Sequence, residues 1–104
     1  MASYILVVPS NAKPGQDEEY NRWYDDTHLG DLLAIPGVTK GRRFNADPAS
    51  PSPPEANYLA IYEIEAEDGA EVLAELGRRA QAGEMEISPT LDTASARMML
   101  YKAR

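Results

Sequence analysis

The chain has 104 residues, 43% hydrophobic and 26% charged, which is typical of one soluble globular domain spanning 1–104. Its formal net charge of −7 opposes contact with nucleic-acid phosphates and anionic membranes, so neither is an expected partner. The absence of cysteine excludes disulfides, zinc–thiolate sites and thiol nucleophiles. No apolar run is long enough for a signal peptide or a membrane span, and we expect a cytoplasmic protein.

The N-terminal segment predicts one strand followed by a helix. Residues 3–9 (SYILVVP) are β-branched and aromatic, as expected of a strand that is buried on both faces. The stretch 9–15 is rich in Asn, Pro and Gly, which predicts a turn. A helix is then predicted from about Gln16.

This helix carries the only tryptophan and the only histidine of the chain. At about 100° per residue, Tyr20, Tyr24 and His28 lie along one side of the helix, one turn apart. Gly30 weakens the helix just beyond them, and Pro36 ends the short helical turn that follows. We therefore expect His28 at a helix break, at the end of an aromatic stripe.

Two strands joined by a proline-rich loop are predicted next. Residues 38–45 alternate loosely between polar and apolar, and Gly41 marks a bulge or a close approach of another group. Residues 46–56 contain four prolines and predict a loop. Residues 57–65 predict a strand. The side chains expected on one face of this strand are Tyr58, Ala60, Tyr62 and Ile64.

A second helix and a last strand complete the chain. Asp68 and Glu71 have the spacing of a helix-starting capping box, and Gly83 lies where a helix-ending glycine is expected. Residues 93–103 (TASARMMLYKA) predict the last strand. This β-α-β-β-α-β order predicts an α+β, ferredoxin-like split β-α-β sandwich, with two helices on one face of a four-stranded antiparallel sheet. A modest core and an apolar second face of the sheet predict a homodimer.

Two runs of sequence also carry a family resemblance. They are residues 23–29 (WYDDTHL) and 32–38 (LLAIPGV), supported by 42–44 (RRF) and 58–63 (YLAIYE). On these residues the chain resembles the dimeric α/β-barrel superfamily, and most of all its EthD-like branch, over about 3–103. Many relatives have a proline where this chain has Gly30.

The resemblance implies a dimeric α/β barrel with an apolar, aromatic-lined pocket between the helices and the sheet of each subunit. It also implies a histidine beside that cavity, at the position of His28. Members include polyketide cyclases, cofactor-free quinol monooxygenases, muconolactone isomerases and haem-degrading enzymes. The resemblance therefore implies no single reaction.

The candidate catalytic residues are His28, Tyr24 and Asp25. The unperturbed pKa of a histidine lies near neutrality, which suits a general acid or base. Tyr24 could share a proton or hold a carbonyl oxygen, and Asp25 could orient the imidazole. Alternatively, His28 only caps carbonyls at a helix end. Asp25 and Asp26 diverge by about 100°, so we expect neither a catalytic carboxylate pair nor a metal site.

The candidate substrate-binding residues are one arginine and a set of aromatic residues. Arg42 and Arg43 point to opposite faces of their strand, so at most one reaches a given pocket. We expect Arg43 to hold an oxyanion or a carboxylate, although pairing of either arginine with Glu63 or Glu65 is the alternative. The aromatic candidates, which are also the simplest core residues, are Tyr20, Trp23, Phe44, Tyr58 and Tyr62.

Together these patterns predict a small cofactor-independent enzyme acting by proton transfer on a hydrophobic, aromatic or polyketide-like carbonyl compound. The reaction would be that of an isomerase, cyclase, lyase or cofactor-free monooxygenase. One alternative is a non-catalytic protein that binds an apolar metabolite. Another is a haem-binding or haem-degrading protein with His28 as the only ligand, although the acidic chain offers few cations for the propionates.

Overall fold

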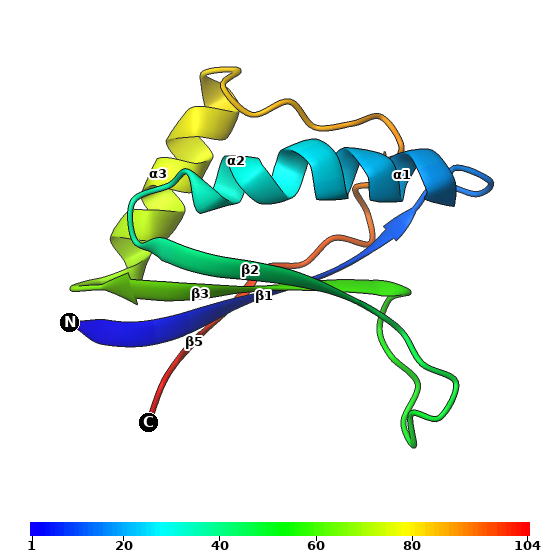
Figure 1. The fold of residues 1–104 in the computed structure, drawn as a ribbon, viewed down its shortest axis with the longest axis horizontal. Helices are drawn as coiled ribbons and strands as arrows, with labels where there is room; N and C mark the ends of the chain where they lie inside the picture. The colour runs from blue at the N-terminus through cyan, green and yellow to red at the C-terminus, as the bar shows by residue number, and fades with distance from the viewer.

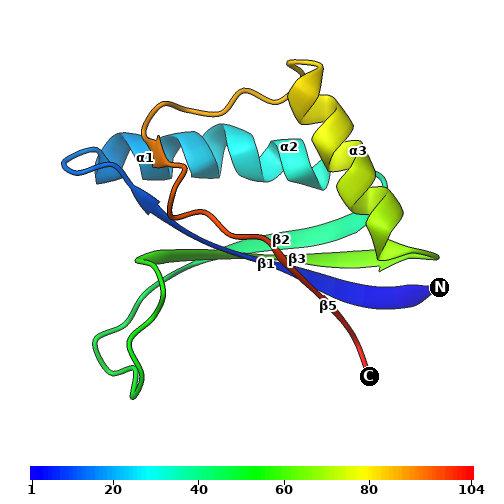
Figure 2. The same cartoon turned by 180° about the vertical axis from the view of Figure 1, so that it is seen from behind.

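In the computed structural model, which describes residues 1–104, helices cover one face of an antiparallel sheet (Figures 1 and 2). The strand order is β2-β3-β1-β4, and β5 also pairs with β1. The predicted α+β, ferredoxin-like fold is therefore confirmed. In chain order the elements are β1 (Ala2–Ala12), α1 (Asp17–Trp23), the π-helical turn η1 (Tyr24–His28), α2 (Leu29–Leu33), β2 (Val38–Asn45), β3 (Tyr58–Ala66), α3 (Gly69–Gln81), β4 (Leu91–Asp92) and β5 (Met99–Lys102).

The first helical layer is one rod, made of α1, η1 and α2, and the π-helical turn lies in its middle (Figure 1). The backbone N–H of Leu29 donates to the carbonyl of Tyr24, five residues back, which is the π-helical pattern. The predicted break at Gly30 is wrong, because the helix runs through this residue and the irregularity lies one turn earlier. Gly37, with a φ of 98°, makes the turn into β2.

Gly41 lies where β2 packs against the rod. A Cβ atom added there would lie 3.0 Å from a ring carbon of Tyr62 and 3.2 Å from Cδ1 of Leu29. The predicted close approach is confirmed, while the bulge in this strand lies between Val38 and Lys40. Because only glycine leaves this space empty, the rod can pack directly on the Tyr62 ring.

The hydrophobic core lies between the sheet and the helices. The predicted inward face of β3 supplies Ala60, Tyr62 and Ile64, all nearly fully buried. The other buried apolar residues come from the remaining elements; they are Leu6, Tyr20, Tyr24, Leu32, Ile35, Val72 and Met85. Three of these ten are tyrosines, so the core contains hydroxyl groups that need partners.

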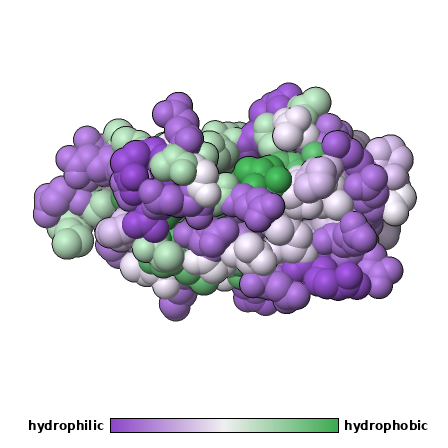
Figure 3. Space-filling view, turned by 90° about the horizontal axis from the view of Figure 1, so that it is seen from above, coloured by the Kyte–Doolittle hydropathy of each residue, from purple (hydrophilic) through white to green (hydrophobic).

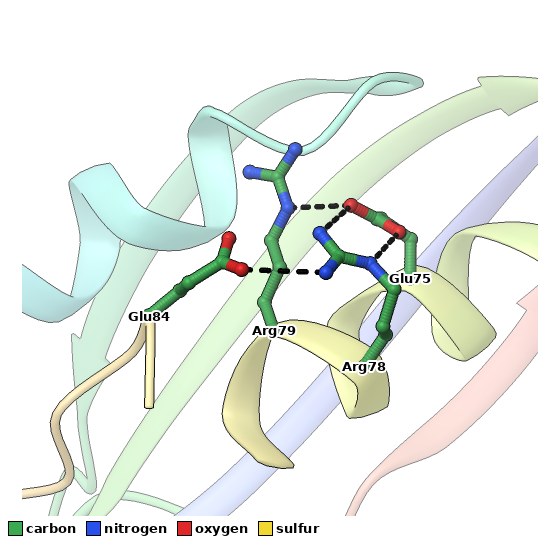
Figure 4. Close-up of polar contacts among 4 residues, drawn as sticks. All are labelled: Glu75, Arg78, Arg79 and Glu84. Carbon is green, nitrogen blue, oxygen red and sulfur yellow. Dashed lines mark hydrogen bonds and ion pairs between the residues drawn. The ribbon is translucent and has the colours of Figure 1, made fainter. Parts of the chain in front are cut away.

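Helix α3 begins after Asp68 and ends before Gly83, as predicted, but Glu71 does not complete the predicted capping box. The side chain of Asp68 accepts a hydrogen bond from the N–H of Ala70, and Gly83 has a φ of 75°. Near the end of the helix, Arg78 binds Glu75 within α3, at 2.8 Å, and Glu84 beyond it, at 3.3 Å (Figure 4). The second ion pair ties the segment after α3 to the helix. Figure 4 also shows the pair of Arg79 with Glu75, at 2.7 Å.

The last predicted strand is wrong in its extent, because two short strands replace it. β4 and β5 both pair with β1, but residues 93–98 between them leave the sheet. The Asp92 carboxylate accepts from the N–H of Ala94, and the Ser95 hydroxyl donates to the Asp92 carbonyl. Short polar side chains of this kind offer the backbone partners outside a sheet.

The second face of the sheet has no covering element within one chain (Figures 1 and 2). Strand β1 was predicted to be buried on both faces, yet Ile5 is 38% exposed whereas its neighbour Leu6 is 3% exposed. Phe44 and Tyr101 are also exposed. The loop between β2 and β3 projects to this same side of the sheet (Figure 1).

Candidate active site

A cavity of about 520 Å³ lies between the rod, β1, α3 and the irregular segment 84–98. This volume is within the range of small-molecule pockets. Seen from the helical side, the surface is mostly hydrophilic, with a small hydrophobic area near its middle (Figure 3). Eleven of the fourteen lining residues are hydrophobic: Val8, Trp23, Tyr24, Leu32, Leu76, Ala80, Met85, Ile87, Leu91, Ala96 and Met98. The other three are Ser10, His28 and Arg97.

The His28 imidazole lies in an aromatic corner of this cavity. It stacks on the Trp23 ring with 4.6 Å between centroids, and it meets the Tyr24 ring edge-on at 4.8 Å. Residues five apart diverge by about 140° on a regular α-helix, so Trp23 and His28 could not stack there. The π-helical turn joins residues five apart and brings the two rings to one side.

Burial lowers the pKa of His28 to about 4; the Asp31 carboxylate opposes the shift and the Arg43 cation adds to it. The imidazole is therefore neutral at pH 7. Its Nδ1 atom is buried without a hydrogen-bond partner. Since α2 continues beyond His28, the residue does not end a helix, and the premise of a carbonyl-capping role is absent.

Tyr24 presents a hydroxyl that keeps its proton. The Tyr62 hydroxyl donates to that of Tyr24 over 3.0 Å, deep in the core. Burial raises the pKa of Tyr24 to about 12, and it raises the pKa of Tyr62 further still. Because Tyr24 accepts from Tyr62, its own proton is left to donate elsewhere. Tyr24 is thus suited to hydrogen-bond donation rather than to proton transfer.

Arg43 is a buried cation behind this corner. Its guanidinium lies 4.3 Å from the centroid of the Tyr24 ring and 5.5 Å from that of Tyr20. Nη1 donates to the Asp25 carboxylate and Nη2 to the side-chain oxygen of Asn21, both at 2.9 Å. The arginine therefore pairs with Asp25, and not with Glu63 or Glu65.

Three buried polar side-chain atoms have no hydrogen-bond partner, and all three belong to this cluster. They are Nε1 of Trp23, Nδ1 of His28 and Nε of Arg43. Unsatisfied buried polar groups are rare in folded proteins because each costs about 1–3 kcal/mol. All three side chains surround the Tyr24 ring, where the rod meets β2. Buried polar groups therefore cost the fold stability at this place, as they do at functional sites.

The structure brings together only some of the predicted site residues. His28, Tyr24 and Trp23 line the cavity. Tyr62 lies behind Tyr24, and Tyr20 lies behind Ser10, with which it shares a hydrogen bond. The others lie outside the cavity lining. Asp25 accepts a hydrogen bond from Arg43, and Tyr58 donates one to Asp17 at the protein surface. Phe44 is exposed on the open face of the sheet.

The wall contributed by segment 84–98, including Arg97, was not predicted from the sequence. This segment was expected to be partly a turn and partly a strand, and neither pattern places a residue over a cavity. Leu76 and Ala80 lie four residues apart on α3, and this helical spacing of apolar residues was the available signal for them. The arginine gave no signal, because a single charge in a predicted strand is ordinary.

No family model and no curated protein matches this chain. Among solved structures, a monooxygenase candidate from Shewanella loihica PV-4 matches with 14% identity and a TM-score of 0.65, covering 100% of this chain and 97% of that one. An EthD family protein from Bacillus halodurans C-125 matches with 14% identity and a TM-score of 0.60, covering 100% of both chains.

Two further solved structures match almost the whole of this chain. A dimeric ferredoxin-like protein of unknown function from Thermobifida fusca YX has 14% identity and a TM-score of 0.60, over 98% of this chain and 92% of that one. A variant of SnoaB, a cofactor-independent oxygenase from Streptomyces nogalater, has 16% identity and a TM-score of 0.52, over 99% and 92%.

The chain has a ferredoxin-like fold. The resemblance stated from the sequence is confirmed at this level, since an EthD family protein is among the matches. At these identities the likeness establishes the fold alone. No helix of the structure has both the length and the hydropathy needed to cross a membrane.

Proposed function

We propose that this protein is a cofactor-independent enzyme that moves a proton on a hydrophobic, aromatic or polyketide-like carbonyl compound. The observation that carries the proposal is a neutral imidazole in the wall of an apolar cavity, edge-on to a tyrosine ring. The tyrosine hydroxyl has its own proton to donate. A base beside a hydrogen-bond donor is the pairing that enolate chemistry requires.

In the proposed reaction, neutral His28 removes a proton from the carbon next to the substrate carbonyl. The electrons of the broken C–H bond move into the carbonyl and form an enolate. The Tyr24 hydroxyl donates to the enolate oxygen, and the bond it accepts from Tyr62 strengthens that donation. The imidazolium is disfavoured by burial, so it returns its proton readily, to the same or to another carbon.

This route accommodates isomerisation and cyclisation without an added reagent. An oxygenase reaction would start from the same enolate and consume dioxygen. In that case a methylene group becomes a carbonyl, which retains one oxygen atom, and the second oxygen leaves as water with the two hydrogens. The oxygenase named among the similar structures, and the monooxygenase candidate, support this version.

Proton abstraction can be tested without knowing the natural substrate. A panel of aromatic and polyketide-like ketones is incubated with the protein in D2O, and deuterium incorporation next to the carbonyl is followed by mass spectrometry. We expect exchange with the wild type and a loss of at least about 100-fold in His28→Gln, as for other general bases. Asp26→Asn, an exposed change on the same rod, is the matched control. Equal exchange by His28→Gln and the wild type would remove His28 from the mechanism.

A second candidate is a non-catalytic protein that binds an apolar metabolite. The observation in its favour is the low pKa of His28, which makes the imidazole a weak base, in a lining that is mostly hydrophobic. This candidate predicts ligand binding by the wild type without exchange for any compound of the panel. It also predicts that His28→Gln binds the same ligands.

We propose further that the working form is a homodimer joined through the open face of the sheet. The exposed apolar side chains on that face, and the dimeric protein among the similar structures, support this. The Ile5→Glu/Phe44→Glu double variant should elute as a monomer when light scattering follows gel filtration. A wild-type protein that is monomeric at micromolar concentration would contradict the assembly.

A further inference from the structure

Arg97 is the only charged residue among the fourteen that line the cavity. The other two polar residues of the lining carry no charge at pH 7: His28 is neutral, and the Ser10 hydroxyl is shared with Tyr20. A charged group on a ligand in this cavity therefore has a single possible counter-charge within the lining.

The position of Arg97 is fixed by its own backbone and side chain. Its N–H donates to the carbonyl of Pro9 over 3.1 Å, which ties the residue to β1. One guanidinium nitrogen, Nη1, donates to the carbonyls of Ala94, at 2.9 Å, and Ala96, at 2.8 Å. These bonds leave Nε and Nη2, which can together grip a carboxylate with two parallel hydrogen bonds.

Arg97 also lacks an acidic partner, although the chain has seven more acidic than basic residues. The ion pairs of the structure use Arg22, Arg43, Arg78 and Arg79. The role that the sequence suggested for Arg43, holding an anionic group, is closed to that residue because Asp25 and Asn21 occupy its guanidinium. Arg97 has the free donors that this role needs.

The location of Arg97 sets the orientation of a ligand. Arg97 is exposed, and so are Met98 and Ile87 beside it in the lining, which places this part of the wall at the mouth. His28 is half-buried, farther from solvent. An acidic group held at the mouth would leave an apolar body to fill the interior and meet the imidazole.

We propose that Arg97 is a substrate-binding residue that holds an acidic group at the mouth of the cavity, so that the ligand is an amphipathic aromatic acid and not a neutral hydrocarbon-like compound. This inference rests on the proposed function for the reacting end of the ligand, but the charge recognition is testable by binding alone. Because the net charge of the chain is negative, the rest of the surface repels anions, and Arg97 is the favoured place for an anionic group to bind.

Two fluorescent probes with the same aromatic body separate charge from apolar burial. They are 1-anilinonaphthalene-8-sulfonate, an anion, and N-phenyl-1-naphthylamine, which lacks the sulfonate. We expect Arg97→Gln to weaken binding of the anion about tenfold and to leave the neutral amine unchanged, as for loss of one charge-assisted hydrogen-bond pair. Arg97→Lys should retain part of the preference. Arg22→Gln, an exposed arginine outside the lining, should change neither probe.

The chain supplies its own reporters of where a probe binds. His28 and Trp23 are the only residues of their kinds, so their ring signals in NMR are single and assignable, and both line the cavity. A probe in the cavity must shift both signals, whereas a probe on the open face of the sheet leaves them in place.

The binding results test the role of Arg97 independently of the proposed proton transfer by His28. Probes that shift the His28 and Trp23 signals but bind Arg97→Gln and the wild type equally would overturn the role of Arg97. So would equal weakening of both probes, or signals that neither probe moves. The proton-transfer proposal is judged separately, by deuterium exchange in His28→Gln.

Discussion

The two walls of the cavity are built in opposite ways. The wall on the rod is helical, aromatic and densely packed, and two of its buried polar atoms, Nε1 of Trp23 and Nδ1 of His28, lack partners. The opposite wall, segment 84–98, has only the two-residue β4 as regular structure, and its residues at the mouth are exposed. The difference teaches that reactivity and recognition have separate physical requirements: a shifted pKa needs burial, whereas selecting a charged ligand needs an accessible, unpaired charge.

The largest expected effect is a loss of folding stability at acid pH, caused by the buried imidazole of His28. The pKa of His28 is about 4 in the folded protein, against the ordinary value of 6.5 in the unfolded chain, so between these pH values the unfolded state binds a proton that the folded state does not. Stability is then complete above pH 6.5 and is lost as pH falls toward 4, by about 3 kcal/mol from this residue.

Urea unfolding at pH 7, 5.5 and 4 measures this, with His28→Gln as the comparison. Carboxylate contributions are common to both proteins, so they cancel in the difference. The wild type should lose about 3 kcal/mol more than the variant over this range. Parallel losses in the two proteins would show that the imidazole is not held in its neutral form by burial.

Removing the Tyr24 hydroxyl should slow the proposed proton transfer. Tyr24→Phe retains the ring that packs on His28 and Arg43, but it loses the O–H proposed to stabilise the enolate. We expect deuterium exchange to fall about 100-fold, as for loss of one oxyanion donor. Tyr62→Phe removes only the supporting hydroxyl and should cost less. An exchange rate in Tyr24→Phe equal to that of the wild type would assign the enolate to another donor.

The same substitution at two arginines compares the walls directly. Arg43→Met leaves Asp25 without its partner and removes the cation over Tyr24, so we expect a loss of about 2 kcal/mol of unfolding free energy. Arg97→Met removes no ion pair, and the two carbonyls that it releases are at the exposed surface, where water can replace the guanidinium, so the change should stay within about 0.5 kcal/mol. Thermal or urea unfolding gives both values. Equal losses at the two sites would erase the distinction between a structural and a recognition arginine.

The smallest expected effect tests the continuity of the rod. Gly30 lies inside α2, has no positive φ, and offers open space where a Cβ would be. Gly30→Ala should therefore raise the unfolding free energy by about 0.5–1 kcal/mol, because alanine is the better helix former. Gly37→Ala, at a φ of 98°, is the contrasting control and should destabilise. A destabilised Gly30→Ala variant would support a helix break at Gly30 after all.

Patterns that depend on local chemistry were predictable. The capping Asp68, the glycine at 83 and the inward face of β3 follow from hydrogen-bonding groups, backbone freedom and a two-residue period. The π-helical turn could not be predicted. The free-energy cost of its irregular backbone is offset by the packing of Trp23, Tyr24 and His28, which no residue-by-residue pattern contains. The prediction of the last strand failed for a local reason. Asp92 and Ser95 form hydrogen bonds that favour a turn, and these compete with an otherwise plausible strand pattern.

The sequence by itself determined the fold and placed Tyr24 and His28 on one side of a helix, because helical and strand periods act over a few residues and need no knowledge of distant contacts. Only the tertiary structure decided that the imidazole is neutral, that Asp25 belongs to Arg43, and that Arg97 stands at the mouth. Burial and pairing of charges depend on which distant segments meet, and a one-dimensional pattern does not specify those meetings.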